Sequence, residues 1–220
     1  GLGDVYKRQR VPRFGATSFY EAVQSMTLAH ICIFMETLGE TTCPGRIDQF
    51  LNPFYEKDVA AGNISRERAK EILGAFCVKL CETIPMHGEV GTSTLGGLTS
   101  WEVVTIGGQD KDGNDATNEL SFILLELADE LRMRQPNFHV RIHKNTPKAF
   151  YDEVIRINFG PGSAPAMYND ETIIESMTDI GYSLEDARNY VAIGCVEPTA
   201  PGKTLASTDA AMYNLSLIHI

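Results

Sequence analysis

Residues 191–198 read VAIGCVEP, and this stretch decides both the fold class and the chemistry expected of the chain. Its first three residues are apolar, which is typical of a buried strand, and the strand is expected to end at Gly194. Cys195 and Glu197 follow two residues apart, and Pro198 restricts the backbone behind them. Because residues two apart in an extended chain point the same way, the thiol and the carboxylate are predicted to face one pocket.

A carboxylate so close to a thiol is unfavourable for an ordinary cysteine nucleophile. It raises the pKa of the thiol and disfavours the reactive thiolate, whereas a nucleophile needs an electropositive neighbour. A cysteine beside a glycine is more often a small buried residue without a chemical role. The pair Cys195 and Glu197 is better explained if the sulfur works as a neutral radical and the carboxylate handles a substrate proton.

Upstream of this stretch, helical and strand-like patterns alternate, which predicts the α/β class. Ser18 caps a helix expected over 18–36, and Ser65 caps another that ends near Thr83, before Pro85. Further elements are expected in the order strand 103–106, helix 118–134, strand 138–142, a helix opened by Thr146 and Pro147, strand 166–168, helix 170–180 and strand 191–193. We expect consecutive strand–helix units of one barrel or open sheet.

The composition is that of a folded, acidic protein. Hydrophobic residues make up 43% and charged residues 22% of the 220 residues, and the formal net charge is −10. Such a surface repels nucleic acid and anionic membranes, so neither is expected as a partner. No apolar run is long enough to span a bilayer, no secretory signal is recognisable, and the five cysteines form no compact framework. We therefore expect reduced thiols and a cytoplasmic location.

Both ends of the chain differ from the sequence next to them. Residues 4–9 read DVYKRQ and residues 215–220 read LSLIHI, and both resemble translations of a sequencing-adaptor end. We expect residues 1–9 and 215–220 to be foreign to the protein, and residues 10–214 to be part of a longer barrel domain, cut at both ends.

Several other patterns have simple structural explanations. Residues 110–121 begin like a calcium-binding loop but lack its glycine and its final glutamate, which favours a surface turn. Cys77 and Cys81 lie one helical turn apart without a further ligand nearby, which favours core packing. His139 and His143 share one face of a predicted strand; they could be ligands, although structural histidines are more common.

The segment GCVEP at 194–198, followed by PGK at 201–203, resembles the cysteine loop of the glycyl radical dehydratases and lyases. The family order continues through CPGRIDQF at 43–50, VTIGG at 104–108, DGNDATNEL at 112–120, QPN at 135–137, VRIH at 140–143 and PAMYND at 165–170. The resemblance covers essentially all of residues 10–214.

This resemblance implies a ten-stranded α/β barrel of two half-sheets, in which the cysteine loop reaches the centre. The chain would supply roughly the first half-barrel. The resemblance implies no bound cofactor, but a protein glycyl radical on a glycine outside this chain, installed by a radical S-adenosylmethionine activating enzyme. It also implies that the partners are this activating enzyme, a small-molecule substrate and, in the full-length protein, a second copy in a homodimer.

The resemblance also implies roles for individual residues. A thiyl radical on Cys195 takes a hydrogen from a hydroxyl-bearing carbon, Glu197 removes the hydroxyl proton, and water or another heteroatom group leaves. Asp209 matches an aspartate of the diol dehydratases that acts as acid or orients the leaving group. Val196 stands where pyruvate formate-lyase has a second, adjacent cysteine, so acyl transfer through two thiols is not expected. A buried pocket is needed to protect the radical.

The positions implied in substrate binding reproduce no single known substrate set. Glu40 and Thr41 stand where diol dehydratases have His-Ser, and Thr208 stands where they have histidine. Choline trimethylamine-lyase shares that threonine, but Met212 replaces its tyrosine. A carboxylate at Glu40 would suit a cationic or polyhydroxyl substrate, or else face solvent or pair with Arg46. The reaction class, a small-molecule lyase or dehydratase, is therefore predicted, and the substrate is left open.

Two alternatives stay open. A glycyl radical decarboxylase of arylacetates carries the same Cys-x-Glu pattern and would need a site for the carboxylate of its substrate. A catalytically inactive homologue is the second, although the intact pair Cys195 and Glu197 argues against decay. The 220-residue chain itself is expected to be inactive, because it lacks the radical glycine and half of the barrel.

Overall fold

The computed structural model describes residues 10–36, 43–83, 88, 89, 93, 102–160, 165–194 and 196–204. Its helices are α2 (Phe19–Glu36), α3 (Ile47–Phe50), α4 (Asn52–Ala60), α5 (Arg66–Glu82), α7 (Glu119–Leu131), α8 (Lys148–Asn158), α9 (Asp170–Asp179) and α10 (Leu184–Arg188). Its strands are β1 (Val103–Gly107), β2 (Asn137–Ile142), β3 (Ala166–Asn169), β4 (Val191–Ile193) and β5 (Glu197–Thr199). The predicted α/β class is confirmed.

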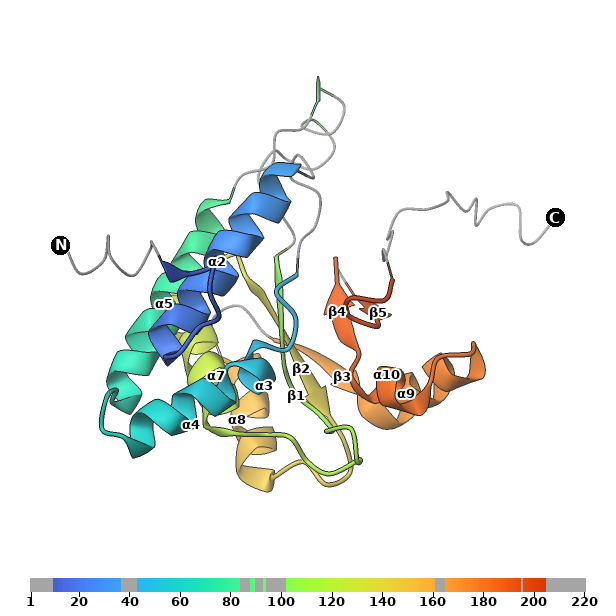
Figure 1. Ribbon diagram of the computed structural model, residues 1–220. Coiled ribbons are helices and arrows are strands. Elements are labelled where there is room, and N and C mark those ends of the chain that lie inside the picture. The colour runs from blue at the N-terminus through green and yellow to red at the C-terminus, as the bar shows by residue number, and fades with distance from the viewer. Residues whose placement is uncertain are drawn as a thin grey trace.

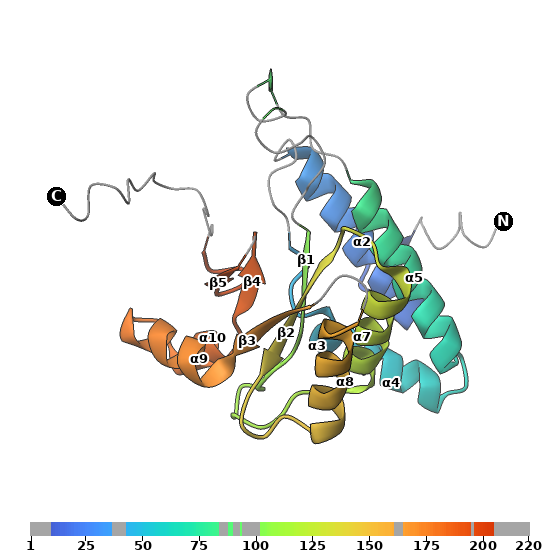
Figure 2. The same ribbon diagram turned by 180° about the vertical axis from the view of Figure 1, so that it is seen from behind.

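Strands β1, β2 and β3 form a parallel sheet in the order of the sequence. Helix α7 connects β1 to β2 and helix α8 connects β2 to β3, so the chain repeats a strand–helix unit as its sequence pattern predicts. Helices α2, α5, α7 and α8 lie on one side of this sheet, and the β4–β5 hairpin lies on the other (Figure 1). Figure 2 shows the same arrangement from behind.

The two faces of the sheet belong to two separate hydrophobic cores. Val104, Ile106 and Val140 point toward the helices and are fully buried in the larger core. Val103 and Tyr168 point the other way and pack in a smaller core with residues of α9, α10 and β4. This alternation follows from the period of two along a strand. We call the side of the smaller core the inner face and the helix-covered side the outer face.

Capping groups explain where the helices begin. The Ser65 hydroxyl accepts a hydrogen bond from the Arg68 backbone N–H at 3.2 Å, as its position before α5 predicts. The Ser18 hydroxyl likewise accepts from the Glu21 N–H at 3.2 Å. The predicted return bond of the capping box is different, because the Glu21 carboxylate accepts from the N–H of Thr17 at 2.8 Å.

Strand β5 was not predicted, since a proline inside a strand argues against one. Pro198 is the register partner of Ala192 in the antiparallel β4–β5 ladder. A proline is tolerated there because β5 is an edge strand, which pairs with β4 alone among the described strands. The extended pair Glu197 and Pro198 therefore belongs to a hairpin and not to an isolated loop.

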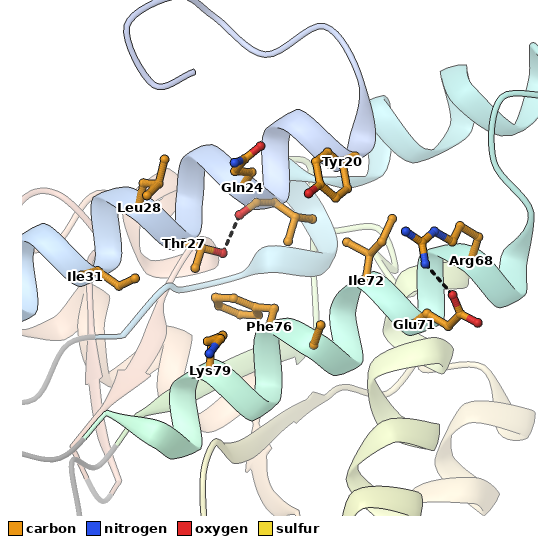
Figure 3. Close-up of a pocket in the computed structure, with 12 residues that line it drawn as sticks. Tyr20, Gln24, Thr27, Leu28, Ile31, Arg68, Glu71, Ile72, Phe76 and Lys79 are labelled. Carbon is orange, nitrogen blue, oxygen red and sulfur yellow. Dashed lines mark hydrogen bonds and ion pairs between the residues drawn. The ribbon is translucent and has the colours of Figure 1, made fainter. Parts of the chain in front are cut away.

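A groove of about 540 Å³ runs between α2 and α5 on the outer face (Figure 3). Val23, Ile72 and Phe76 contribute apolar surface to it, and the ion pair of Arg68 with Glu71 lies at its edge. The sheet separates this groove from the β4–β5 hairpin, so the groove is remote from Glu197. None of the helices in the described ranges is both long enough and apolar enough to cross a bilayer.

Candidate active site

The β4–β5 hairpin is attached to the inner face of the sheet. The backbone N–H of Ala192 in β4 donates a hydrogen bond to the Thr105 hydroxyl of β1 at 3.3 Å. Ala192 also packs in the smaller core with Val103 and Tyr168. Glu197, which pairs with Ile193 beside Ala192, is therefore held on the inner side of the sheet.

A fully buried ion pair fixes the chain just before β4. Nε and Nη2 of Arg141 donate to the two carboxylate oxygens of Asp170 at 2.8 and 2.9 Å. The same guanidinium donates to the carbonyl oxygens of Tyr190 and Arg188 at 3.0 and 2.9 Å. The Tyr190 hydroxyl donates to Asp170 at 2.8 Å, and the Arg141 guanidinium lies 3.9 Å from the centre of the Tyr190 ring. Burial of this tyrosine raises its pKa well above the usual range.

A second buried arginine contacts the same segment. Arg46 donates to the carbonyl oxygen of Gly107 at 2.9 Å and approaches the carbonyl oxygen of Arg188 at 3.4 Å. Burial, together with the charge of nearby Arg141, lowers the pKa of Arg46 to about 10. Asp48 accepts from the Gly107 N–H at 2.8 Å, so the 46–48 segment binds both polar groups of that glycine.

In the sequence, the predicted radical cysteine stands between the two strands of the hairpin. Residues 194–196 lie between the register partners Ile193 and Glu197. Gly194 has φ +60, a left-handed conformation that other residues adopt only with strain. Cys195 itself lies outside the described residues, as do the other predicted site residues Glu40, Thr41, Thr208, Asp209 and Met212. Their roles stay predictions.

Glu197 is described, and it is half-buried. One of its carboxylate oxygens accepts a hydrogen bond from the Val196 N–H at 2.9 Å. Its charge acts on two further titratable groups, the Cys43 thiol and the His139 imidazole. The structure thus brings residues from three distant parts of the sequence together around the predicted base.

Cys43 lies next to the turn of the hairpin. Burial raises the pKa of its thiol to about 12, while the backbone amides of Gly194 and Val103 act in the opposite direction. The charges of Glu102 and Glu197 contribute to the rise. A thiol in this state stays protonated at physiological pH and is no ordinary nucleophile.

The two histidines of the β2 region have different surroundings. His143 Nε2 lies 2.9 Å from a carboxylate oxygen of Asp115, which gives this residue a structural role. His139 instead packs against Tyr168, with 4.9 Å between the ring centres, and burial lowers its pKa to about 4 against the opposing effect of Glu197. Sequence reasoning treated both alike, because the period of two shows the shared face but not the partners.

Cys43 was not recognised as a site neighbour from the sequence. It stands in the CPGRIDQF motif, and nothing in the local pattern connects it to a hairpin about 150 residues further along the chain. Cys43 is brought to the hairpin by the β-bridge between Gly45 and Val104, which places the 43–46 segment beside β1. Such a long-range pairing is not visible in one sequence.

Comparisons with known proteins identify the relatives of this arrangement. The family described as pyruvate formate lyase-like matches residues 4–218. An isethionate sulfite-lyase of Bilophila wadsworthia is 36% identical over 94% of this chain and 25% of its own length. A trans-4-hydroxy-L-proline dehydratase of Clostridioides difficile is 36% identical over 88% of this chain and 25% of its own length. The structure of the B12-independent glycerol dehydratase of Clostridium butyricum, in its glycerol-bound form, matches with a TM-score of 0.80 and 39% identity over 86% of this chain and 24% of that one.

The chain spans about a quarter of the length of the curated relatives it matches. The family match also reaches into residues 4–9 and 215–218, which were predicted to be foreign to the protein. The structure describes neither stretch, and that prediction stays a prediction.

Proposed function

Because the chain belongs to the pyruvate formate lyase-like family, we propose that the full-length protein is a glycyl radical lyase. It eliminates water or another heteroatom group from a small hydroxylated substrate. The observation that carries the proposal is the hairpin on the inner face of the sheet, which holds Glu197 two residues after Cys195. Relatives named as a dehydratase and as a sulfite-lyase support the reaction class.

The proposed reaction uses the residues predicted from the sequence. The Cys195 thiyl radical breaks a substrate C–H bond and forms its own S–H bond, which leaves a carbon radical beside a hydroxyl. Glu197 accepts the hydroxyl proton, and the neighbouring group departs with Asp209 as acid or orienting group. The product radical then takes the hydrogen back from Cys195, so the thiyl radical is regenerated. Glu40, Thr41, Thr208 and Met212 are the proposed substrate contacts.

The Cys195 thiyl radical needs a source, which we place outside this chain. We propose that a radical S-adenosylmethionine activating enzyme forms a glycyl radical on another part of the full-length protein, and that this protein is a homodimer. A cytoplasmic location fits the described cysteines Cys32, Cys43, Cys77 and Cys81, all of which are free thiols.

An arylacetate decarboxylase would need a counter-charge for its substrate, and so would a lyase that acts on an anionic substrate such as trans-4-hydroxy-L-proline or isethionate. A carboxylate substrate needs a positive group close to the site. The buried arginines near the hairpin, Arg46 and Arg141, are already bound to carbonyl oxygens and to Asp170. Neither offers a counter-charge to a substrate.

The test uses the full-length enzyme, activated without oxygen and incubated with glycerol, 1,2-propanediol, trans-4-hydroxy-L-proline or isethionate. Cys195→Ser is expected to abolish turnover and keep the glycyl radical signal in electron paramagnetic resonance, because a serine O–H bond is too strong to form the needed radical. Glu197→Gln is expected to lower turnover ~10² to 10⁴-fold. It should still exchange hydrogen with a deuterated substrate, since abstraction precedes deprotonation. Turnover in Cys195→Ser would remove the proposal.

A further inference from the structure

A row of side chains crosses the inner face of the sheet opposite the hairpin. Thr105 and His139 are register partners on β1 and β2 and share that face. The Thr105 hydroxyl binds the backbone N–H of Ala192, and the next residue, Ile193, is the register partner of Glu197. His139 therefore lies beside the point where the hairpin is attached, on the side of the sheet that carries the predicted base.

The His139 ring is buried and held in place, yet one of its nitrogens is unused. The residue is 2% exposed, and Nδ1 has no hydrogen-bond partner among the described residues. Packing against the Tyr168 ring, with 36° between the ring planes, restricts the imidazole without engaging Nδ1. A buried polar atom left in this way costs free energy unless a ligand or a water binds it.

The charge state of this imidazole restricts what it can bind. Burial lowers the pKa of His139 to about 4, and the charge of Glu197 opposes that shift only in part. The ring is therefore neutral at physiological pH and offers one donor and one acceptor nitrogen. The Cys43 thiol, which also experiences the Glu197 charge, is protonated because burial raises its pKa. The neutral His139 ring and the protonated Cys43 thiol therefore suit an uncharged hydroxyl. Neither group provides a counter-charge to a sulfonate or a carboxylate.

We propose that His139 Nδ1 hydrogen-bonds an uncharged hydroxyl of the substrate, or the water that departs from it. This makes His139 a specificity-determining residue of the elimination proposed above, on which the inference rests. It is distinct from the base Glu197, because a neutral imidazole of this kind orients an oxygen and does not have to accept its proton.

The experiment compares two substitutions in the activated full-length enzyme. His139→Phe keeps an aromatic ring against Tyr168 and removes both nitrogens, whereas His139→Asn places an amide near the position of Nδ1. The probe is whichever of glycerol, 1,2-propanediol, trans-4-hydroxy-L-proline and isethionate the wild type consumes. One lost hydrogen bond in a buried site should lower kcat/KM about tenfold in His139→Phe, mainly through KM. His139→Asn should recover most of that loss.

His143 provides the matched control. It is buried and follows β2 directly, but its Nε2 is bound to Asp115. His143→Asn is expected to lower the melting temperature and to leave KM at the wild-type value. In both His139 variants the glycyl radical content should equal that of the wild type, which separates a binding defect from a failure of activation.

Wild-type KM in His139→Phe, or equal impairment of His139→Phe and His139→Asn, would overturn the assignment. If His139→Phe does not fold, His139→Gln replaces it. The glutamine amide lies near the position of Nε2, so His139→Gln should retain less activity than His139→Asn. Equal activity of these two variants counts against the proposal. Turnover in Cys195→Ser, by contrast, defeats the proposed elimination. A wild type that consumes none of the four probes acts on a different substrate. His139 is then judged from crystals of the unactivated full-length protein soaked in glycerol. A glycerol oxygen within hydrogen-bond distance of Nδ1 supports the assignment, and its absence refutes it.

Discussion

Replacing Asp170 by asparagine should destabilise this chain more than any other change that keeps the shape of a side chain near the hairpin. The Asp170 carboxylate accepts four hydrogen bonds, from Nε and Nη2 of Arg141, from the Tyr190 hydroxyl and from the Gln109 N–H. Asp170 and Arg141 are both 0% exposed. Asp170→Asn removes the negative charge and leaves the buried guanidinium without its counter-ion.

The magnitude follows from the burial of both partners. Breaking a buried ion pair by removing one charge costs about 3–5 kcal/mol, because the remaining charge is uncompensated. Tyr190→Phe removes a single hydrogen bond to the same carboxylate and should cost roughly 1.5–3 kcal/mol. If urea unfolding has a slope of ~3 kcal/mol/M, the midpoint shifts by about 1–1.7 M for Asp170→Asn and about 0.5–1 M for Tyr190→Phe.

A double replacement shows whether Arg141 and Asp170 stabilise the fold only as an ion pair, or whether the hydrogen bonds of Arg141 to the backbone contribute as well. Isolated buried pairs can often be exchanged for apolar residues without loss of stability. Here Arg141 also satisfies the carbonyl oxygens of Arg188 and Tyr190, which Arg141→Met would leave buried without a partner. Arg141→Met with Asp170→Leu should therefore remain destabilised, as measured by circular dichroism in urea. A double variant as stable as the wild type, or an Asp170→Asn shift no larger than that of Tyr190→Phe, would refute this reasoning.

Two further predictions concern titratable groups. His139 takes up a proton near pH 6.5 in the unfolded chain but only near pH 4 in the folded one. Between these two pH values the unfolded state binds more protons than the folded state. The free energy of unfolding therefore falls as the pH drops from 6.5 to 4. The loss should reach roughly 3 kcal/mol at pH 4 relative to His139→Phe, measured as the difference in urea midpoint between the two proteins. Iodoacetamide at pH 8 should modify the exposed Cys32 first and spare Cys43 and Cys77, because burial raises the pKa of both thiols to about 12 and leaves about one molecule in 10⁴ as thiolate. Equal labelling of all three by mass spectrometry would contradict the burial of the two thiols.

The sequence predicted the elements whose signals are local. The cap at Ser65, the strand that becomes β1 and the apolar run of β4 are all confirmed within one or two residues. Helix α7 ends at Leu131, before the predicted residue 134, because Arg132 adopts a left-handed conformation with φ 48. Helices α3 and α4 were missed, since their first turns lack the hydroxyl or carboxamide caps that mark a helix start.

The site was predictable only where the sequence brings its residues together. Cys195 and Glu197 are neighbours in the chain, so a local rule connects them. Cys43 and His139 come close to Glu197 through the pairing of β1 with β2 and with the 43–46 segment. One sequence carries no record of those pairings, and an unpartnered ring nitrogen can be recognised only when its surroundings are known.

The buried arginines also explain why the motifs CPGRIDQF and VRIH, which contribute no proposed catalytic group, contact the segment before the cysteine loop. Arg46 and Arg141 both bind backbone oxygens of residues 188–190, immediately before β4. Glu197 pairs with Ile193 at the other end of that strand, ~10 Å away at about 3.3 Å per residue. A strand of three residues has few internal degrees of freedom, so a displacement at its anchored end is transmitted to the end that holds the base. Catalysis depends on geometry to within about 1 Å. Loss of either arginine should therefore reduce turnover of the full-length enzyme more than the accompanying loss of folded protein explains.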